Sequence, residues 1–137
     1  MTTPPSILFI DDDMIERMKF NRTVTSLGFE NKIIEATNGE EALKILESKD
    51  SLPDIILLDL NMPRISGKEF LKILKSNETL KFIPTIVLTT SSNHKDLLEC
   101  YKIGIAGYVL KPLKYEDYMK KISKVISYWN TNELIIL

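Results

Sequence analysis

Carboxylates stand at the ends of two predicted strands that lie far apart in the chain. Asp11 to Asp13 follow the apolar run Ile7–Ile10, and Asp59 follows the apolar run Ile55–Leu58. Two carboxylates about 4 Å apart repel each other by roughly 4 kcal/mol at an effective dielectric of about 20. Such a group favours either a bound proton, which raises a carboxyl pKa, or a divalent cation that prefers oxygen ligands, for which Mg²⁺ is the natural candidate.

A hydroxyl and an ammonium group follow two further predicted strands. Thr89 ends the run Thr85–Thr89, and Lys111 follows the run Tyr108–Leu110. In an open parallel sheet, the loops after the carboxyl ends of the strands form one ligand crevice. A carboxylate nucleophile beside Mg²⁺, a lysine and a hydroxyl is the set of groups that forms an aspartyl phosphate. Asp59 is then the nucleophile, while Lys111 and Thr89 bind phosphoryl oxygens.

Each of these residues, taken alone, has a simpler interpretation. Asp13 is expected to cap the first helix, because a carboxylate there accepts backbone N–H bonds. One of the residues Thr90 to Ser92 could cap the fourth helix in the same way. Lys111 alone would be a solvated lysine, and Asp59 alone a turn residue. Their convergence on one edge of the sheet is what favours a site.

Short apolar runs alternate with longer segments of helical periodicity, which is typical of βα units around a parallel sheet. The expected fold class is α/β, a doubly wound sheet of five parallel strands with five helices. The strands are predicted at Ile7–Ile10, Lys32–Glu35, Ile55–Leu58, Thr85–Thr89 and Tyr108–Leu110. The helices are predicted at Met14–Leu27, Glu40–Ser48, Gly67–Ser76, His94–Ile103 and Tyr115–Trp129.

Length and composition bound the function of the chain. Its 137 residues suit one domain, which we place at residues 6–130, after a flexible N-terminus at 1–5 and before an apolar tail at 131–137. A net charge of -1 provides no general attraction to nucleic acid or to a membrane surface. No segment is long and apolar enough for a membrane span. The single Cys100 is expected to be a buried thiol, which suits a cytoplasmic location.

Four segments resemble the receiver domains of two-component response regulators, in order and over essentially the whole chain. "ILFIDDD" is similar to the first strand and acidic pair of that family, and "IILLDLNMPRISG" to its phosphoacceptor segment. "PTIVLTTSS" is similar to its fourth strand, and "GYVLKP" to its fifth. The resemblance implies a flavodoxin-like fold with the strand order 2-1-3-4-5. "LTTS" and the absence of an output domain resemble stand-alone regulators that partner phytochrome-type kinases.

The resemblance also implies a phosphoryl and metal site. Asp59 would accept the phosphoryl group, and Mg²⁺ would be the cofactor. Asp12 would bind Mg²⁺ directly and Asp11 largely through water. Asp59 and the backbone carbonyl of Asn61 would complete the protein ligands.

Further residues match the family's catalytic and switch positions. Thr89 and Lys111 match its phosphate-sensing hydroxyl and lysine, and the Lys111–Pro112 peptide would be cis. Tyr108 matches its switch aromatic, which turns inward when the threonine is drawn to the phosphoryl group. This change would alter the surface of the fourth helix, fifth strand and fifth helix. Asn61 and Ser91 occupy positions that tune hydrolysis in the family.

Partners follow from the same resemblance. The phosphoryl donor would be a histidine kinase or a histidine phosphotransfer protein, because His94 is the only histidine of the chain and stands at a predicted helix start. The signal would leave through a downstream protein or, alternatively, by transfer to a further histidine in a phosphorelay. A homodimer could form through the fourth helix, fifth strand and fifth helix, or through the apolar tail. The chain would be no enzyme in the ordinary sense, with self-catalysed phosphotransfer and slow autodephosphorylation.

Other function classes remain open on the sequence alone. Asp11 and Asp13 also fit the D-x-D of haloacid-dehalogenase-like phosphatases, with Asp11 as nucleophile and Asp13 as acid/base, but Asp59 then has no task. A purely structural module would not need Asp12, Asp59, Thr89 and Lys111. Direct DNA binding lacks a helix-turn-helix. A nucleotide-binding protein would need a glycine-rich loop after the first strand, which is absent.

Overall fold

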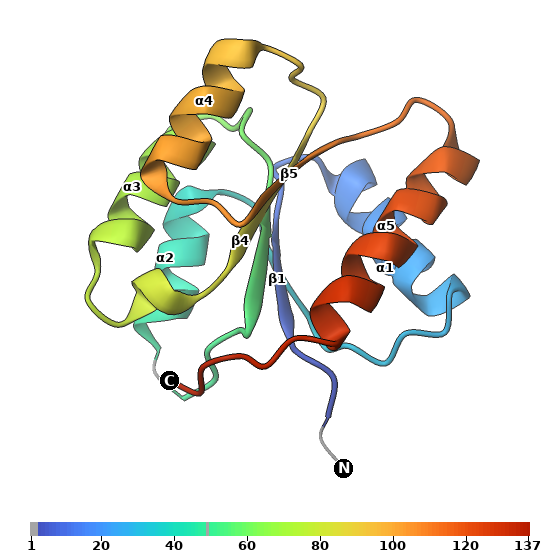
Figure 1. The fold of residues 1–137 in the computed structure, drawn as a ribbon, viewed down its shortest axis with the longest axis horizontal. Coiled ribbons are helices and arrows are strands. Elements are labelled where there is room, and N and C mark those ends of the chain that lie inside the picture. Colours follow the sequence, from blue (N-terminus) through green and yellow to red (C-terminus); the bar gives the residue numbers. More distant parts are fainter. Residues whose placement is uncertain (1–2, 49) are drawn as a thin grey trace.

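Five parallel strands form a single sheet in the order β2-β1-β3-β4-β5. The structure, a computed structural model, describes residues 3–48 and 50–137. Helices α1 and α5 cover one face of the sheet, and α2, α3 and α4 cover the other, so the molecule has three layers (Figure 1). This arrangement confirms the predicted α/β fold class and strand order.

The element bounds agree with the prediction to within one residue at each end. The strands are β1 (Ile7–Ile10), β2 (Ile33–Ala36), β3 (Ile55–Leu58), β4 (Thr85–Thr89) and β5 (Gly107–Leu110). The helices are α1 (Met14–Ser26), α2 (Gly39–Glu47), α3 (Gly67–Ser76), α4 (His94–Ile103) and α5 (Tyr115–Asn130). A short 3-10 helix, η1 (Leu80–Phe82), was not predicted.

Every residue of β1, β3 and β4 is buried, and successive side chains enter opposite cores. Leu8 of β1 packs in the cluster under α2, α3 and α4, together with Phe70. Phe9 enters the cluster under α1 and α5, where its ring stacks on Phe20 with centroids 4.2 Å apart. The central strands are therefore held rigidly on both sides, which fixes the residues that follow them.

Side chains cap the helices α1 to α4 at their first turns, near the carboxyl edge of the sheet. Asp13 accepts a hydrogen bond from the Ile15 N–H at 2.9 Å, which confirms its predicted role as the α1 cap. The α4 cap is Asn93, whose Oδ1 accepts from Lys95 N–H at 2.8 Å. The prediction of a cap among Thr90 to Ser92 is therefore wrong.

The strand register brings the predicted site residues to one edge. Ile10 pairs with Leu58, so Asp11 and Asp59 leave adjacent strands at the same level. Thr89 pairs with Leu110, which places Lys111 directly beyond the end of β4. The parallel sheet thus converts four separate segments into one surface at its carboxyl end.

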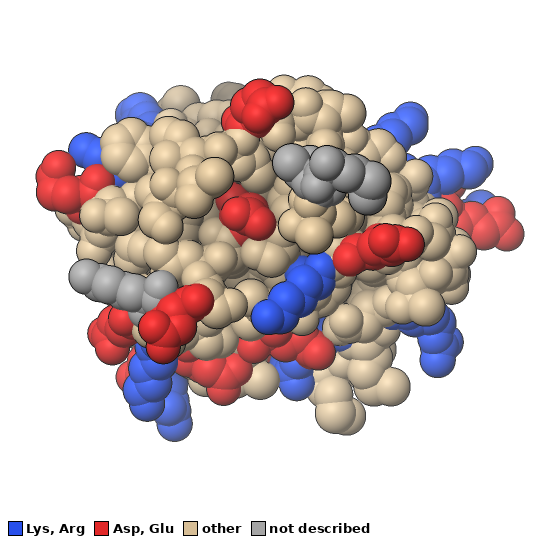
Figure 2. All heavy atoms as spheres, turned by 90° about the horizontal axis from the view of Figure 1, so that it is seen from below, with Lys and Arg blue, Asp and Glu red and all other residues tan. Residues whose placement is uncertain are grey.

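The described chain both begins and ends at the opposite end of the sheet (Figure 1). Residues 1 and 2 of the expected flexible N-terminus lie outside the described residues, while the Pro5 carbonyl accepts a hydrogen bond from Asn31 at 2.8 Å. In the tail, Leu134 packs against the core and Ile136 is 96% exposed. Figure 2 shows this end, where uncharged residues cover most of the surface and acidic and basic side chains are scattered among them. In the described part of the chain, no helix has the length and apolarity that crossing a membrane requires.

Candidate functional site

Three carboxylates from two strand ends meet at the carboxyl edge of the sheet. Asp11, Asp12 and Asp59 each offer an oxygen, and these oxygens lie within 4.8 Å of one another. Asp11 is 1% exposed and Asp59 8% exposed, whereas Asp12 is open to solvent. Hard oxygen ligands with one solvent-accessible side fit Mg²⁺, which keeps several of its waters in protein sites. The geometry therefore fits the metal that the sequence led us to expect.

Lys111 reaches into this acidic group from the end of β5. Its Nζ lies 3.0 Å from Asp11 Oδ2 and 3.1 Å from Glu16 Oε1, and its side chain is only 8% exposed. Burial lowers the pKa of the Lys111 ammonium, but Asp11, Asp59 and Glu16 together raise it above its ordinary value. Lys111 is thus a buried cation at the site and not a solvated surface lysine.

Glu16 is a site residue that the sequence analysis missed. It lies in the first turn of α1 and bonds Lys19 at 3.0 Å as well as Lys111. Although burial raises the pKa of its carboxyl, these two lysines bring the pKa below the ordinary value. A glutamate five positions after Asp11 gives no local signal, because its partner Lys111 is distant in the sequence.

The surroundings of the Asp59 carboxyl disfavour its ionised form and raise its pKa. Burial raises its pKa to about 6, and the neighbouring charge of Asp11 adds to the rise. Lys111, the Asn61 backbone N–H and the Thr89 hydroxyl oppose it by stabilising the ionised form. A carboxylate that is ionised at neutral pH yet poorly solvated is a suitable nucleophile and a suitable cation ligand.

This raised pKa predicts that Asp59→Asn stabilises the metal-free chain in a pH-dependent way. The folded state binds the Asp59 proton more tightly than the unfolded state, so stability falls as pH rises between about 4 and 6. Above that window the asparagine variant should be more stable by about 1 to 3 kcal/mol. Urea denaturation without divalent metal, at about pH 4.5 and about pH 7.5, measures the difference. An equal gain at both pH values would contradict the prediction.

Thr89 and Tyr108, the expected switch pair, lie on adjacent strands and share a partner. Thr89 is fully buried at the end of β4, and its hydroxyl oxygen accepts a hydrogen bond from the Ser91 N–H at 3.3 Å. The half-buried Tyr108 donates its hydroxyl hydrogen to the Ser91 carbonyl at 2.8 Å. The structure thus brings both residues to the β4–α4 loop, while their switching role remains a prediction.

A cavity of about 590 Å³ opens over the carboxylates. Its walls include the predicted site residues Asn61 and Lys111, together with the exposed Thr90. Thr90 therefore lines the same cavity as Asp59. A cavity of this size beside the Asp59 carboxylate has room for a phosphoryl group and a hydrated metal ion.

The Lys111–Pro112 peptide was expected to be cis, but the described residues contain no cis peptide, so this prediction is wrong. An X–Pro bond keeps a trans preference that local sequence alone does not overcome. Asp13, the acid/base of the phosphatase alternative, turns its carboxylate to the α1 backbone and lies outside the three-carboxylate group.

Comparison with known proteins agrees with this geometry. The family described as response regulator receiver domain matches residues 7–123. The response regulator Rcp1 of Synechocystis is 30% identical over 92% of this chain and 89% of its own length. The chemotaxis protein CheY of Pseudomonas aeruginosa is 32% identical over 87% of this chain and 94% of its own.

Solved structures give the same result. The Mn²⁺-bound form of Rcp1 superposes with a TM-score of 0.89 at 29% identity, covering 97% of this chain and 100% of Rcp1. The phosphorylated cyanobacterial phytochrome response regulator RcpA superposes with a TM-score of 0.91 at 27% identity, covering 98% of this chain and 100% of RcpA.

Proposed function

Because the chain belongs to the response regulator receiver domain family, whose members are signalling proteins, we propose that it accepts a phosphoryl group on Asp59. The observation that carries this proposal is the meeting of Asp11, Asp12 and Asp59 beside the buried ammonium of Lys111. Asp59 ends the rigid central strand β3, so its carboxylate has little freedom to move. This fixed position favours in-line phosphoryl transfer.

The same residues are proposed to hold Mg²⁺. Asp12 and Asp59 would be direct ligands together with the Asn61 backbone carbonyl, and Asp11 would act through a water molecule. When bound, the metal supplies positive charge that offsets the repulsion among the carboxylates and the phosphoryl oxygens. The Mn²⁺-bound form of Rcp1 is a related protein with a divalent cation, and this supports the assignment.

In the proposed transfer, an Asp59 carboxylate oxygen forms the new bond to phosphorus. The bond between phosphorus and the donor's imidazole nitrogen breaks, and its electron pair stays on that nitrogen. Lys111 leaves one of its two carboxylate partners to bind a phosphoryl oxygen, and the Thr89 hydroxyl donates to another. These contacts compensate the charge that develops on the phosphoryl group.

The donor is proposed to be a histidine kinase or a histidine phosphotransfer protein in the cytoplasm. RcpA, a phytochrome response regulator, is similar to this chain over its full length, which favours a kinase of the phytochrome type. Movement of Thr89 and Tyr108 would alter the surface of α4, β5 and α5, where Leu98 and Tyr101 are each 50% exposed. A downstream protein or a second copy of the chain would bind there.

One experiment tests this function. The chain is incubated with acetyl phosphate, with Mg²⁺ or with a chelator, quenched at times from milliseconds onwards, and weighed as the intact protein. We expect one phosphoryl adduct that forms only with the metal. No adduct at any time, or one that ignores the metal, would refute the proposal. Size exclusion of the same samples tests whether phosphorylation produces a dimer.

A further inference from the structure

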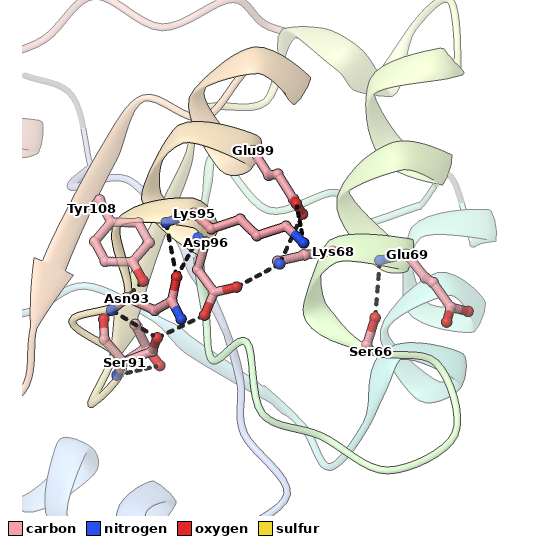
Figure 3. Close-up of polar contacts among 10 residues, drawn as sticks. Ser66, Lys68, Glu69, Ser91, Asn93, Lys95, Asp96, Glu99 and Tyr108 are labelled. Atoms are coloured by element: carbon pink, nitrogen blue, oxygen red, sulfur yellow. Dashed lines mark hydrogen bonds and ion pairs between the residues drawn. The ribbon is translucent and has the colours of Figure 1, made fainter.

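All three polar groups of Ser91 are engaged in hydrogen bonds within the β4–α4 loop and its neighbours. Its N–H donates to Thr89 Oγ1 at 3.3 Å, and its carbonyl accepts from the Tyr108 hydroxyl at 2.8 Å. Its own hydroxyl donates to Asp96 Oδ2 at 2.7 Å (Figure 3). Ser91 therefore joins the two expected switch residues to the first turn of α4.

Asp96 is held in turn by a cation from another helix. Lys68 of α3 donates to Asp96 Oδ1 at 2.5 Å and to Glu99 Oε2 at 2.8 Å (Figure 3). The hydrogen bond to Asp96, and to a smaller extent the one to Glu99, raises the pKa of Lys68. The hydrogen bond from Lys68, and to a smaller extent the one from Ser91, lowers the pKa of Asp96. Because each carboxylate oxygen of Asp96 has its own donor, the side chain has one preferred orientation.

The hydrogen bond from the Ser91 N–H occupies one lone pair of the Thr89 hydroxyl oxygen. A hydroxyl has one hydrogen to donate and two lone pairs that accept. Since the Thr89 oxygen already accepts from the Ser91 N–H, its hydrogen is free to point toward Asp59.

We propose that Asp96, anchored by Lys68, is a positioning residue that orients the Thr89 hydroxyl toward Asp59 through Ser91. This inference rests on the proposed function of Asp59 as the phosphoryl acceptor. It adds a path that leads from the site to the facing sides of α3 and α4. Movement of Thr89 toward a phosphoryl group pulls on Ser91, and this pull reaches the Lys68 ion pairs.

The direct test compares variants that break different parts of this chain of contacts. Asp96→Ala removes the acceptor of Ser91 and the partner of Lys68, so we expect phosphorylation by acetyl phosphate to slow about fivefold, the ratio that one ordinary hydrogen bond supports. Asp96→Asn keeps an acceptor for Ser91 and should recover most of the rate. Glu99→Gln is the matched control, because it removes the charge of the other partner of Lys68 without touching Ser91, and its rate should stay within about twofold of wild type.

A second measurement does not depend on phosphorylation. Hydrogen exchange of the Ser91 amide, followed by NMR, should speed up in Asp96→Ala and stay slow in Asp96→Asn and Glu99→Gln. A wild-type chain that takes no phosphoryl group would refute the proposed function, while this amide would still test the positioning of Ser91. Unchanged rate and exchange in Asp96→Ala, or an equal effect of Glu99→Gln, would overturn the inference.

Discussion

Asp59→Asn is expected to eliminate the phosphoryl adduct completely. An amide has no anionic oxygen to attack phosphorus. Asp11 also follows a central strand, but both of its carboxylate oxygens already accept hydrogen bonds, from the Asp13 N–H at 3.0 Å and from Lys111 Nζ at 3.0 Å. The measurement is intact mass after incubation with acetyl phosphate and Mg²⁺. The variant should remain folded, because it removes the buried charge whose poor solvation, together with repulsion from Asp11, raises the Asp59 pKa.

Two further substitutions test whether the loss of the adduct is specific to Asp59. Asp13→Asn is the matched control: it changes a carboxylate two residues from Asp11, and asparagine caps helix α1 as well as aspartate does, so labelling should persist. Asp11→Asn separates the two carboxylate chemistries. If Asp59 is the acceptor, this variant still takes the phosphoryl group at high Mg²⁺, though more slowly. Labelling that is lost in Asp11→Asn and kept in Asp59→Asn would instead indicate a phosphatase-like nucleophile.

The sequence was most informative where a buried strand meets a polar residue. Strands β1, β3 and β4 were predicted at their observed bounds, because each is a short apolar run that ends at Asp or at a threonine pair. The edge strand β2 was displaced by one residue. Its run includes the exposed Glu35, so the apolar pattern does not mark where pairing with β1 begins and ends.

The sequence did not predict contacts between side chains that are far apart in the chain. Glu16 and Asp96 each sit in the first turn of a helix, where an acidic residue is ordinary. Only the fold brings Lys111 to Glu16 and Lys68 to Asp96. The prediction of the α4 cap was wrong for a related reason. Several residues before α4 have side chains that can cap a helix, and the hydroxyl of one of them, Ser91, donates to Asp96 instead. The 3-10 turn η1 likewise depends on Asn77, whose side chain accepts from two backbone N–H groups.

Gly67 makes the close approach between α3 and the loop that follows β3 possible. It is the first residue of α3, and its N–H donates to the Leu60 carbonyl at 3.2 Å. A Cβ at this position would lie 2.6 Å from Leu60 Cα and 2.7 Å from the Asp59 carbonyl oxygen. Both are backbone atoms, which cannot rotate away as a flexible side chain would. Any side chain here must displace the segment that carries Asp59 and Asn61.

Gly67→Ala should therefore lower the free energy of unfolding by about 3 kcal/mol, although alanine is the better helix former by about 1 kcal/mol. The same shift should weaken Mg²⁺ binding, because the loop of Asp59 and Asn61 moves. Gly107→Ala is the control: its Cβ would meet the Ile86 side chain at 3.6 Å, an ordinary contact, so both quantities should change little. Urea denaturation and calorimetric titration with Mg²⁺ measure them. If Gly67→Ala retains wild-type stability and metal affinity, the position of the loop after β3 does not depend on its close contact with Gly67.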